Sequence, residues 1–315
     1  MKIYSTILLV TLAFLFTGCS GFLYTDKPAL EFQDIDYTFP VKTALQNPRV
    51  AYIDQGTGSE VIVLVHGLAS NAGFWRYNIP ELAKKYRVIA VDLPGYGKSQ
   101  KGDYPYKLTW YAGIIKNLLD DLKIKKVNLL GHSMGGQIAI HFSLMYPEYL
   151  NKLILASPAG VEEFQKGEGD WLRSVMTING VKLTPEDGIR RNLANNFYNF
   201  PDNLEWMVEE RTRMAKASEF TEFCYAVVRS VNAMLDEPTT RLLRNIKTPT
   251  LIIHGENDWL IPNPYLNPGF TSDVFKLGEA LITGSKRVEI PACGHMLQME
   301  KPEIFNAEVL KFLAN

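Results

Sequence analysis

The sequence predicts an α/β fold, in which a mostly parallel central sheet is flanked by helices and carries an inserted helical cap. Short, unbroken apolar runs alternate along the chain with helical stretches, and apolar strands without alternation are typical of a parallel sheet buried on both faces. The alternation stops between about residues 161 and 245, a long, polar and helix-compatible stretch. Because a structureless loop of that length is implausible in a compact domain, we expect a cap there.

Six apolar runs are expected to form the strands of this sheet. They cover 61–65, 87–91, 126–130, 153–156, 250–253 and 287–290. Helices are expected over 109–122, 134–146, 276–282 and 302–313. The first of these helices has Trp110, Ile114, Leu118 and Leu122 at spacings of three and four residues, which is the pattern of a core-facing stripe. The predicted core therefore comprises residues 49–160 and 246–315, interrupted by a cap over 161–245.

Composition excludes several classes of protein. The chain has 315 residues, with 33 basic and 34 acidic side chains. This balance gives no surplus of positive charge for a nucleic-acid partner. Three cysteines are too few for a disulfide framework, and their spacing matches no zinc pattern. We expect no metal and no organic cofactor.

The N-terminus has the features of an export signal. Lys2 precedes an apolar run over residues 7–16, which is too short to span a bilayer. The run ends in Leu15-Phe16-Thr17-Gly18-Cys19, which resembles the bacterial lipobox, although Phe16 stands where leucine is usual. Residues 1–18 are then a signal peptide, Cys19 carries lipid, and residues 19–48 are a tether and entry segment. A plain secretory signal or an uncleaved anchor is the alternative.

This N-terminus predicts where the protein is located. We expect an exported protein, either an outer-membrane or cell-surface lipoprotein associated with the membrane through its N-terminal lipid, or a secreted one.

A candidate nucleophile stands where a predicted strand ends and a helix begins. Gly131-His132-Ser133-Met134-Gly135 has the Gly-x-Ser-x-Gly pattern of a nucleophile elbow. A serine on such a sharp turn needs neighbours without Cβ, which Gly131 and Gly135 supply. The helix N-terminus also places backbone N–H groups beside Ser133, where negative charge develops during acyl transfer.

A catalytic serine needs a base, and the chain has five histidines. His132 adjoins the nucleophile and is expected to point elsewhere, and His141 lies inside the next helix. His66 and His254 stand at strand ends before glycine, where structural hydrogen bonds are expected. His295 lies in a loop between the last strand and the last helix, at the sheet edge where ligands collect. We therefore expect His295 to be the general base.

The acid that orients this histidine is expected in Gly255-Glu256-Asn257-Asp258, after the penultimate strand. Asp258 is favoured and Glu256 is the alternative. The order is then Ser133, Asp258, His295. An oxyanion hole needs two backbone donors, which we expect from Met134 and from the turn at His66-Gly67-Leu68, at Leu68.

Taken together, these motifs resemble the α/β-hydrolase superfamily. They include His66-Gly67-Leu68, the run from Asp92 to Ser99 (Asp-Leu-Pro-Gly-Tyr-Gly-Lys-Ser), the elbow, the Asp258 loop and Gly294-His295. The length, lipobox-like start and capped layout are similar to the bacterial family V lipases, which include cold-active lipases. That resemblance implies hydrolysis of triacylglycerols or other carboxylic esters through a Ser-His-Asp triad and an acyl-enzyme.

Other functions remain open. A short-chain carboxylesterase, a carbon–carbon bond hydrolase of dienoates and a perhydrolase all use this scaffold, and a non-enzymatic surface lipoprotein is a further alternative. Export argues against the dienoate hydrolase, whose substrates arise in the cytoplasm. The aromatic residues and methionines of the cap either form its own core or line an acyl pocket. Cys224 and Cys293 are expected to be buried thiols, with a disulfide as the alternative.

Overall fold

The computed structural model describes residues 22–315. The expected signal peptide and Cys19 lie outside this range.

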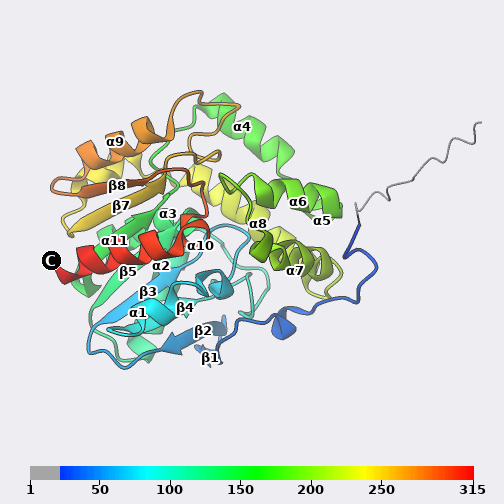
Figure 1. The fold of residues 1–315 in the computed structure, drawn as a ribbon, viewed down its shortest axis with the longest axis horizontal. Coiled ribbons are helices and arrows are strands. Elements are labelled where there is room, and N and C mark those ends of the chain that lie inside the picture. Colours follow the sequence, from blue (N-terminus) through cyan, green and yellow to red (C-terminus); the bar gives the residue numbers. More distant parts are fainter. Residues whose placement is uncertain (1–21) are drawn as a thin grey trace, which may run out of the picture.

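An eight-stranded sheet forms the centre of the molecule (Figure 1). Its strands are β1 (Val41–Ala44), β2 (Val50–Gln55), β3 (Val61–Val65), β4 (Arg87–Val91), β5 (Val127–His132), β6 (Leu150–Ala156), β7 (Thr250–Gly255) and β8 (Lys286–Ile290). Their order is β1-β2-β4-β3-β5-β6-β7-β8, and every pair from β4 to β8 is parallel. The predicted fold class and its six parallel strands are confirmed.

Helices cover both faces of this sheet. They are α1 (Ile79–Leu82), α2 (Leu108–Asp121), α3 (Met134–Met145), α9 (Thr271–Leu281), α10 (Leu297–Glu300) and α11 (Pro302–Ala314). Figure 1 shows α1 and α11 on the near face, where they contact one another, and α2 packs beside α3 behind the sheet. Short 3-10 turns cover Phe32–Asp34, Ala72–Trp75, Pro147–Tyr149, Asp202–Leu204 and Thr240–Asn245.

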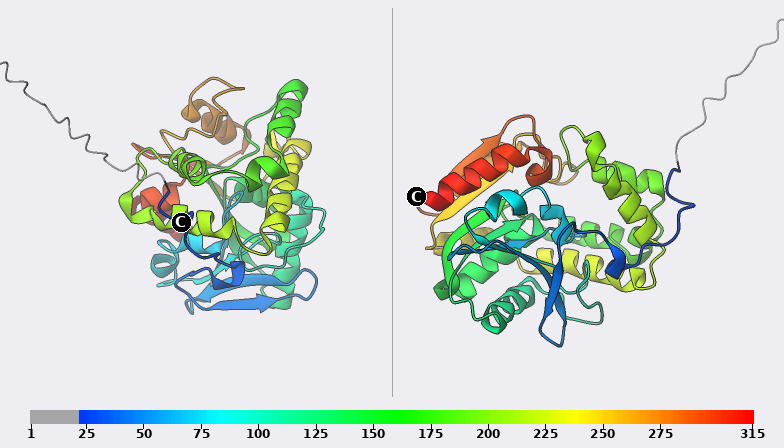
Figure 2. Two further views of the ribbon diagram at one scale, coloured as in Figure 1. Left: turned by 90° about the vertical axis from the view of Figure 1, so that its right-hand side faces the viewer. Right: turned by 60° about the horizontal axis from the view of Figure 1, so that its bottom comes forward.

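Five helices lie between β6 and β7, in the stretch where the sequence predicts a cap. They are α4 (Lys166–Val175), α5 (Ile178–Lys182), α6 (Glu186–Ala194), α7 (Trp206–Met214) and α8 (Phe220–Asp236). Figure 2 shows this group beside the sheet, at the end of the molecule away from the C-terminus. Helix α8 contacts the core helix α2 and buries an apolar face that includes Phe223 and Val227. No helix among the described residues is long and apolar enough to span a bilayer.

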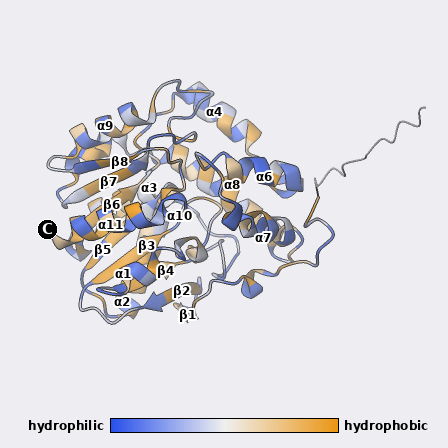
Figure 3. Ribbon diagram, in the orientation of Figure 1, coloured by the Kyte–Doolittle hydropathy of each residue, from blue (hydrophilic) through white to orange (hydrophobic). Residues whose placement is uncertain are grey.

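The parallel strands form the hydrophobic core. Every residue of β3 is buried, and Ile62 to Val65 are fully so. Figure 3 shows the hydrophobic strands in the middle and mixed polarity on the helices around them. Burial on both faces explains why β3 to β7 were recognisable from apolar runs, whereas β8 is an edge strand in which only Ile290 is buried.

Two strands and the start of the chain differ from expectation. β1 and β2 are antiparallel and were not predicted. β1 is a four-residue edge strand with three residues that are not buried, whereas β2 has a buried apolar run over residues 50–53 that was not recognised as a strand. Residues 19–48 were expected to be a tether and entry segment. The part of it that the structure describes, residues 22–48, is packed against the fold, with Phe32, Ile35 and Tyr37 buried. The apolar residues of this segment do not recur at the spacing of a helix or a strand, so the sequence alone does not indicate that they are buried.

Residues 22–31, which we call the N-terminal strap, are bound to the cap. The Glu186 carboxylate, only 3% exposed, accepts hydrogen bonds from the backbone N–H groups of Leu23 (2.7 Å) and Tyr24 (2.9 Å) and from the Thr25 hydroxyl (2.8 Å). Lys27 forms an ion pair with Glu209 of α7 at 3.0 Å. The strap is thus attached to the cap through charge-assisted hydrogen bonds.

Candidate active site

Ser133 stands on a strained turn between β5 and α3. Its backbone has φ 55° and ψ −120°, outside the regions that an L-residue ordinarily adopts. The turn is fixed by hydrogen bonds from the Ser133 N–H to Ala156 O (3.0 Å) and from the Ala159 N–H to Ser133 O (3.0 Å). Ser133 itself is partly exposed, so the strain presents its side chain outside the core.

The glycines around Ser133 are required by close backbone approach. A Cβ on Gly131 would lie 2.2 Å from the carbonyl oxygen of Gly135. A Cβ on Gly135 would lie 2.4 Å from the carbonyl oxygen of Val65, on the neighbouring strand β3. No flexible side chain can relieve these contacts, because the obstructing atoms are backbone.

His295 and Asp258 form a buried pair on neighbouring loops. The His295 Nδ1 lies 2.7 Å from the Asp258 Oδ2, and both side chains are nearly inaccessible. The other carboxylate oxygen accepts hydrogen bonds from the backbone N–H groups of Leu260 (2.9 Å) and Ile261 (3.1 Å). Burial raises the pKa of Asp258, but the His295 ring and these hydrogen bonds outweigh it and hold the pKa below its usual value.

The His295 ring lies next to the nucleophile elbow. Its centroid is 4.8 Å from that of His132, the residue before Ser133. Among the described residues, no hydrogen bond joins the Ser133 hydroxyl to His295 in this structure. Such bonds are often long in unliganded enzymes and tighten when substrate binds. The three residues predicted from the sequence therefore converge at the carboxyl edge of the sheet.

His132 was expected to point elsewhere, and this expectation was wrong. Its Nε2 lies 2.9 Å from the backbone oxygen of His295, and because a carbonyl only accepts, Nε2 carries the proton. Burial, reinforced by the His295 ring, lowers the pKa of His132 to about 3. His132 is thus a neutral donor that holds the His295 loop against the elbow. No local sequence signal could reveal a contact between residues so far apart in the chain.

We expect His132→Phe to lower kcat several-fold, because the His295 loop loses its hydrogen bond to the elbow. His132→Gln keeps an N–H donor and should retain more activity. A hydrogen bond of this kind contributes about 1 kcal/mol net, so both variants should remain folded. Steady-state kinetics with thermal melts would check this, and equal activity in both variants would contradict the assigned role.

The turn after β3 orients one of the expected oxyanion donors. The Leu93 N–H donates to His66 Nε2 (3.1 Å), so His66 carries its proton on Nδ1 and donates it to Gly67 O (2.7 Å). Burial lowers the pKa of His66 to about 4, which keeps the ring neutral. Because a trans peptide is planar, fixing Gly67 O on one side directs the Leu68 N–H to the opposite side.

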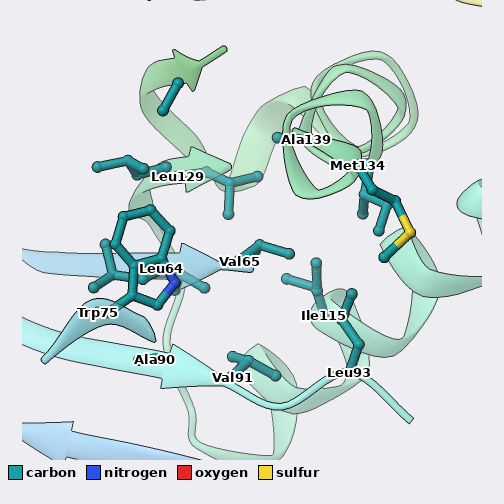
Figure 4. Packing of buried hydrophobic residues seen from close by; sticks show 14 of the residues in the cluster. Leu64, Val65, Trp75, Ala90, Val91, Leu93, Ile115, Leu129, Met134 and Ala139 are labelled. Atoms are coloured by element: carbon teal, nitrogen blue, oxygen red, sulfur yellow. The ribbon is translucent and has the colours of Figure 1, made fainter. Parts of the chain in front are cut away.

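The second expected donor is the backbone N–H of Met134. Met134 is the first residue of α3, so this N–H has no partner within the helix. Its side chain is fully buried, and Figure 4 shows it directed into the core near Ile115 and Leu93. Gly67 lies against the same site, since a Cβ there would be 3.0 Å from Ser133 Cβ. The two candidate donors and Ser133 are therefore neighbours.

Asp92 stabilises the turn that follows β3 through hydrogen bonds to its carboxylate. Its carboxylate accepts hydrogen bonds from the Ala72 N–H (2.7 Å), the Lys98 N–H (2.7 Å) and the Tyr37 hydroxyl (2.8 Å). Burial raises its pKa to about 6 despite these donors. The Asp92–Ser99 motif therefore has a structural role here, connecting the turn after β3 to the segment that follows β4.

The remaining candidates make structural contacts. Glu256, the alternative acid, accepts a hydrogen bond from the Ala292 N–H (3.2 Å). His141 contacts Glu237 O, and Cys224 and Cys293 are free and buried. The described residues contain no group of three or more histidine, cysteine or acidic side chains placed to hold a metal ion.

Comparison with known proteins places this site in a family. Residues 60–302 match the family model described as the alpha/beta hydrolase fold. A 2-hydroxy-6-oxo-6-(2'-aminophenyl)hexa-2,4-dienoic acid hydrolase from Metapseudomonas resinovorans is 31% identical over 278 residues, which cover 84% of this chain and 87% of the relative.

Two solved structures are similar over most of the chain. A probable hydrolytic enzyme from Pseudomonas aeruginosa has a TM-score of 0.81 at 26% identity, covering 91% of this chain and 98% of its own. An esterase from Exiguobacterium antarcticum has a TM-score of 0.74 at 25% identity, covering 88% and 100%.

These relatives support the superfamily that the sequence predicts, but they do not support the narrower lipase family. The superfamily and its serine-hydrolase chemistry are confirmed. The narrower resemblance to family V lipases stays a prediction, since the curated relative is named as a hydrolase of a dienoic acid. With its elbow, its buried His–Asp pair and a family match over residues 60–302, this chain belongs to the alpha/beta hydrolase fold family.

Proposed function

We propose that this protein hydrolyses a bond to a carbonyl carbon through an acyl-enzyme on Ser133. The observation that carries the proposal is the buried 2.7 Å contact between His295 Nδ1 and Asp258 Oδ2, positioned beside the elbow. It leaves His295 Nε2 as the free ring nitrogen of a histidine held in one orientation. A histidine oriented by a carboxylate is what activation of a serine requires.

Each residue then has one role in the reaction. His295 Nε2 removes the hydroxyl proton as Ser133 Oγ bonds to the carbonyl carbon, and the Leu68 and Met134 N–H groups stabilise the oxyanion. The leaving group departs with the proton that His295 returns. Water, deprotonated by His295, attacks the acyl carbon and releases the acid, while Asp258 stabilises the imidazolium.

The first candidate substrate is a 2-hydroxy-6-oxo-dienoic acid, cleaved at a carbon–carbon bond. Support comes from the Metapseudomonas relative, which shares 31% identity over most of both chains. In this reaction the substrate first becomes its keto tautomer, as the proton of the 2-hydroxyl group moves to C5. The group that then leaves the tetrahedral intermediate is a dienolate, which takes up the proton held by His295.

The second candidate is a carboxylic ester, including the triacylglycerols of the lipase resemblance. It is favoured by exposed apolar side chains: Trp259 (59% exposed) and Leu260 directly follow Asp258, and the cap exposes Trp171 and Leu183 elsewhere on its surface. Apolar surface of this kind suits fatty acyl chains. The leaving group in this case is an alkoxide, protonated by His295.

Both candidates are tested with one panel. Purified protein is assayed with a 2-hydroxy-6-oxo-dienoic acid, followed by loss of its absorbance, and with p-nitrophenyl esters of increasing chain length. Ser133→Ala is the control for each substrate. Higher kcat/KM for the dienoic acid supports the first candidate, higher values for esters support the second, and no Ser133-dependent turnover of either contradicts both.

We also propose that the protein is exported and carries lipid on Cys19, on the strength of the lipobox-like sequence. Cys19→Ser is expected to abolish incorporation of labelled fatty acid and to move the protein from the membrane fraction to a soluble one. Thr17→Ser, which keeps a small residue near the cleavage site, is the matched control. Incorporation that survives Cys19→Ser would contradict the assignment.

A further inference from the structure

The turn that presents the Leu68 N–H contains a strained residue. Ala69, the next residue, has φ 55°, in the left-handed region that disfavours residues with a Cβ. The turn is closed by a hydrogen bond from the Ser70 N–H to Gly67 O, which is long at 3.3 Å. Gly67 O is also held by His66 Nδ1 at 2.7 Å, but the backbone of the Ala69–Ser70 peptide has only this long hydrogen bond within the turn, so its orientation depends on a contact from outside.

That contact comes from the cap. The Arg211 Nη2, on α7, donates a hydrogen bond to the backbone oxygen of Ala69 at 2.6 Å. The guanidinium also lies over the Phe223 ring, 4.6 Å from its centroid. Among the described residues Arg211 forms no ion pair with a carboxylate. A half-buried guanidinium therefore has a backbone carbonyl as its hydrogen-bond acceptor, at the one strained residue of the turn.

Helix α7 also contacts the segment just after this turn. The Asn71 side chain donates to Glu210 (3.1 Å), the neighbour of Arg211, and its oxygen accepts from the Gly73 N–H (2.9 Å). Arg76 lies over the Trp206 ring, 3.7 Å from its centroid. Because three separate contacts join α7 to residues 69–76, the position of the cap and the conformation of the turn depend on one another.

We infer that Arg211 is a positioning residue that holds the Ala69 turn, and with it the Leu68 N–H, in the conformation needed to stabilise the oxyanion. The inference rests on the proposed assignment of Leu68 as a donor. If Arg211 has this role, the oxyanion hole is complete only when α7 is docked on the turn. The cap thereby affects the rate of the chemical step, beyond its effect on which substrates enter.

The test is a double-mutant cycle between Arg211→Gln and Ala69→Gly. Glycine adopts the left-handed conformation without a Cβ penalty, so a turn with glycine at position 69 depends less on Arg211. With Ala69 present, we expect Arg211→Gln to slow covalent labelling of Ser133 by a fluorophosphonate, and kcat, at least tenfold with KM nearly unchanged. In the Ala69→Gly background, the same substitution should slow both by less than threefold.

Hydrogen exchange at the Ser70 amide gives a readout that is independent of catalysis. Exchange should accelerate in Arg211→Gln and return toward the wild-type rate in the double variant. Arg213→Gln is the matched control on the same helix, because Arg213 contacts Glu209 and the strap instead of the turn. It should change labelling by less than twofold.

Three outcomes would overturn the inference. The first is equal loss of labelling from Arg211→Gln in both backgrounds with a raised KM for anionic substrates, which would mean that Arg211 contacts the substrate directly. The second is a lower melting temperature with unchanged labelling, which would mean a purely structural role. The third is unchanged exchange at Ser70. Failure of Ser133 to be labelled in the wild type, with Ser70 exchange as expected, would instead contradict the proposed function.

Discussion

Ser133→Ala should lower kcat by about 10⁴-fold or more, because the acyl-enzyme can no longer form. The chain should remain folded, since the Ser133 side chain makes no hydrogen bond to another described residue and is partly exposed. Substrate turnover and fluorophosphonate labelling measure the loss, and a thermal melt measures folding. Residual turnover above about 1% of wild type would contradict the assignment of the nucleophile.

Ser133→Gly separates the chemistry from the strain. Glycine tolerates φ 55° and ψ −120°, a conformation that costs about 1–3 kcal/mol at a residue with a side chain. We therefore expect the glycine variant to be as inactive as the alanine variant but to unfold at a higher temperature than it. A lower melting temperature for the glycine variant would show that the elbow stores no strain.

Asp258→Asn is expected to lower kcat by roughly 10³- to 10⁴-fold, because a neutral amide neither fixes the protonated Nδ1 of His295 nor stabilises the imidazolium. Glu256→Gln is the matched control: Glu256 lies on the same loop and accepts only from the Ala292 N–H. It should retain activity near wild type. If Glu256→Gln caused the larger loss, the acid would have to be reassigned.

The same pair predicts a dependence of stability on pH. The pKa of Asp258 is held below its usual value of about 4, so ionised Asp258 stabilises the fold above that pH. This stabilisation is lost as the pH falls through the folded-state pKa. The difference in melting temperature between wild type and Asp258→Asn should therefore shrink from pH 7 to pH 3. A difference that stays constant or widens on acidification would contradict it.

Much of the fold could be predicted because its signals are local. The buried parallel strands are continuous apolar runs, and the expected helix over 109–122 differs by one residue at each end from α2 (Leu108–Asp121). β1 escaped prediction because an exposed edge strand has no such run, whereas β2 was missed although residues 50–53 are apolar and buried. The packing of Phe32 and Tyr37 was also missed, since a single buried aromatic residue has no periodic pattern around it.

The candidate site also combines residues that have local sequence signals with residues whose contacts are distant in the sequence. Ser133 and its glycines were recognisable because strand, turn and helix follow one another within a few residues. His132 was misjudged, because its partner is a backbone oxygen 163 residues away. The contact of Arg211 with Ala69 spans 142 residues and involves a carbonyl, a group that every residue has. Sequence patterns identify particular residue types at particular spacings along the chain. These two contacts involve backbone oxygens of distant residues, so they depend neither on a residue type at the acceptor nor on a short spacing.

The N-terminal strap has a practical consequence for anyone who shortens this chain. A variant that begins at Phe32 would look reasonable, because residues 22–31 are distant from the triad in sequence. It would leave the buried Glu186 carboxylate without the three donors that Leu23, Tyr24 and Thr25 supply. Because the strap itself covers Glu186, water would replace these donors, and the cap would lose its charge-assisted hydrogen bonds to the strap, so α6 should loosen although the core is intact. Affinity tags and protease sites therefore belong before Phe22.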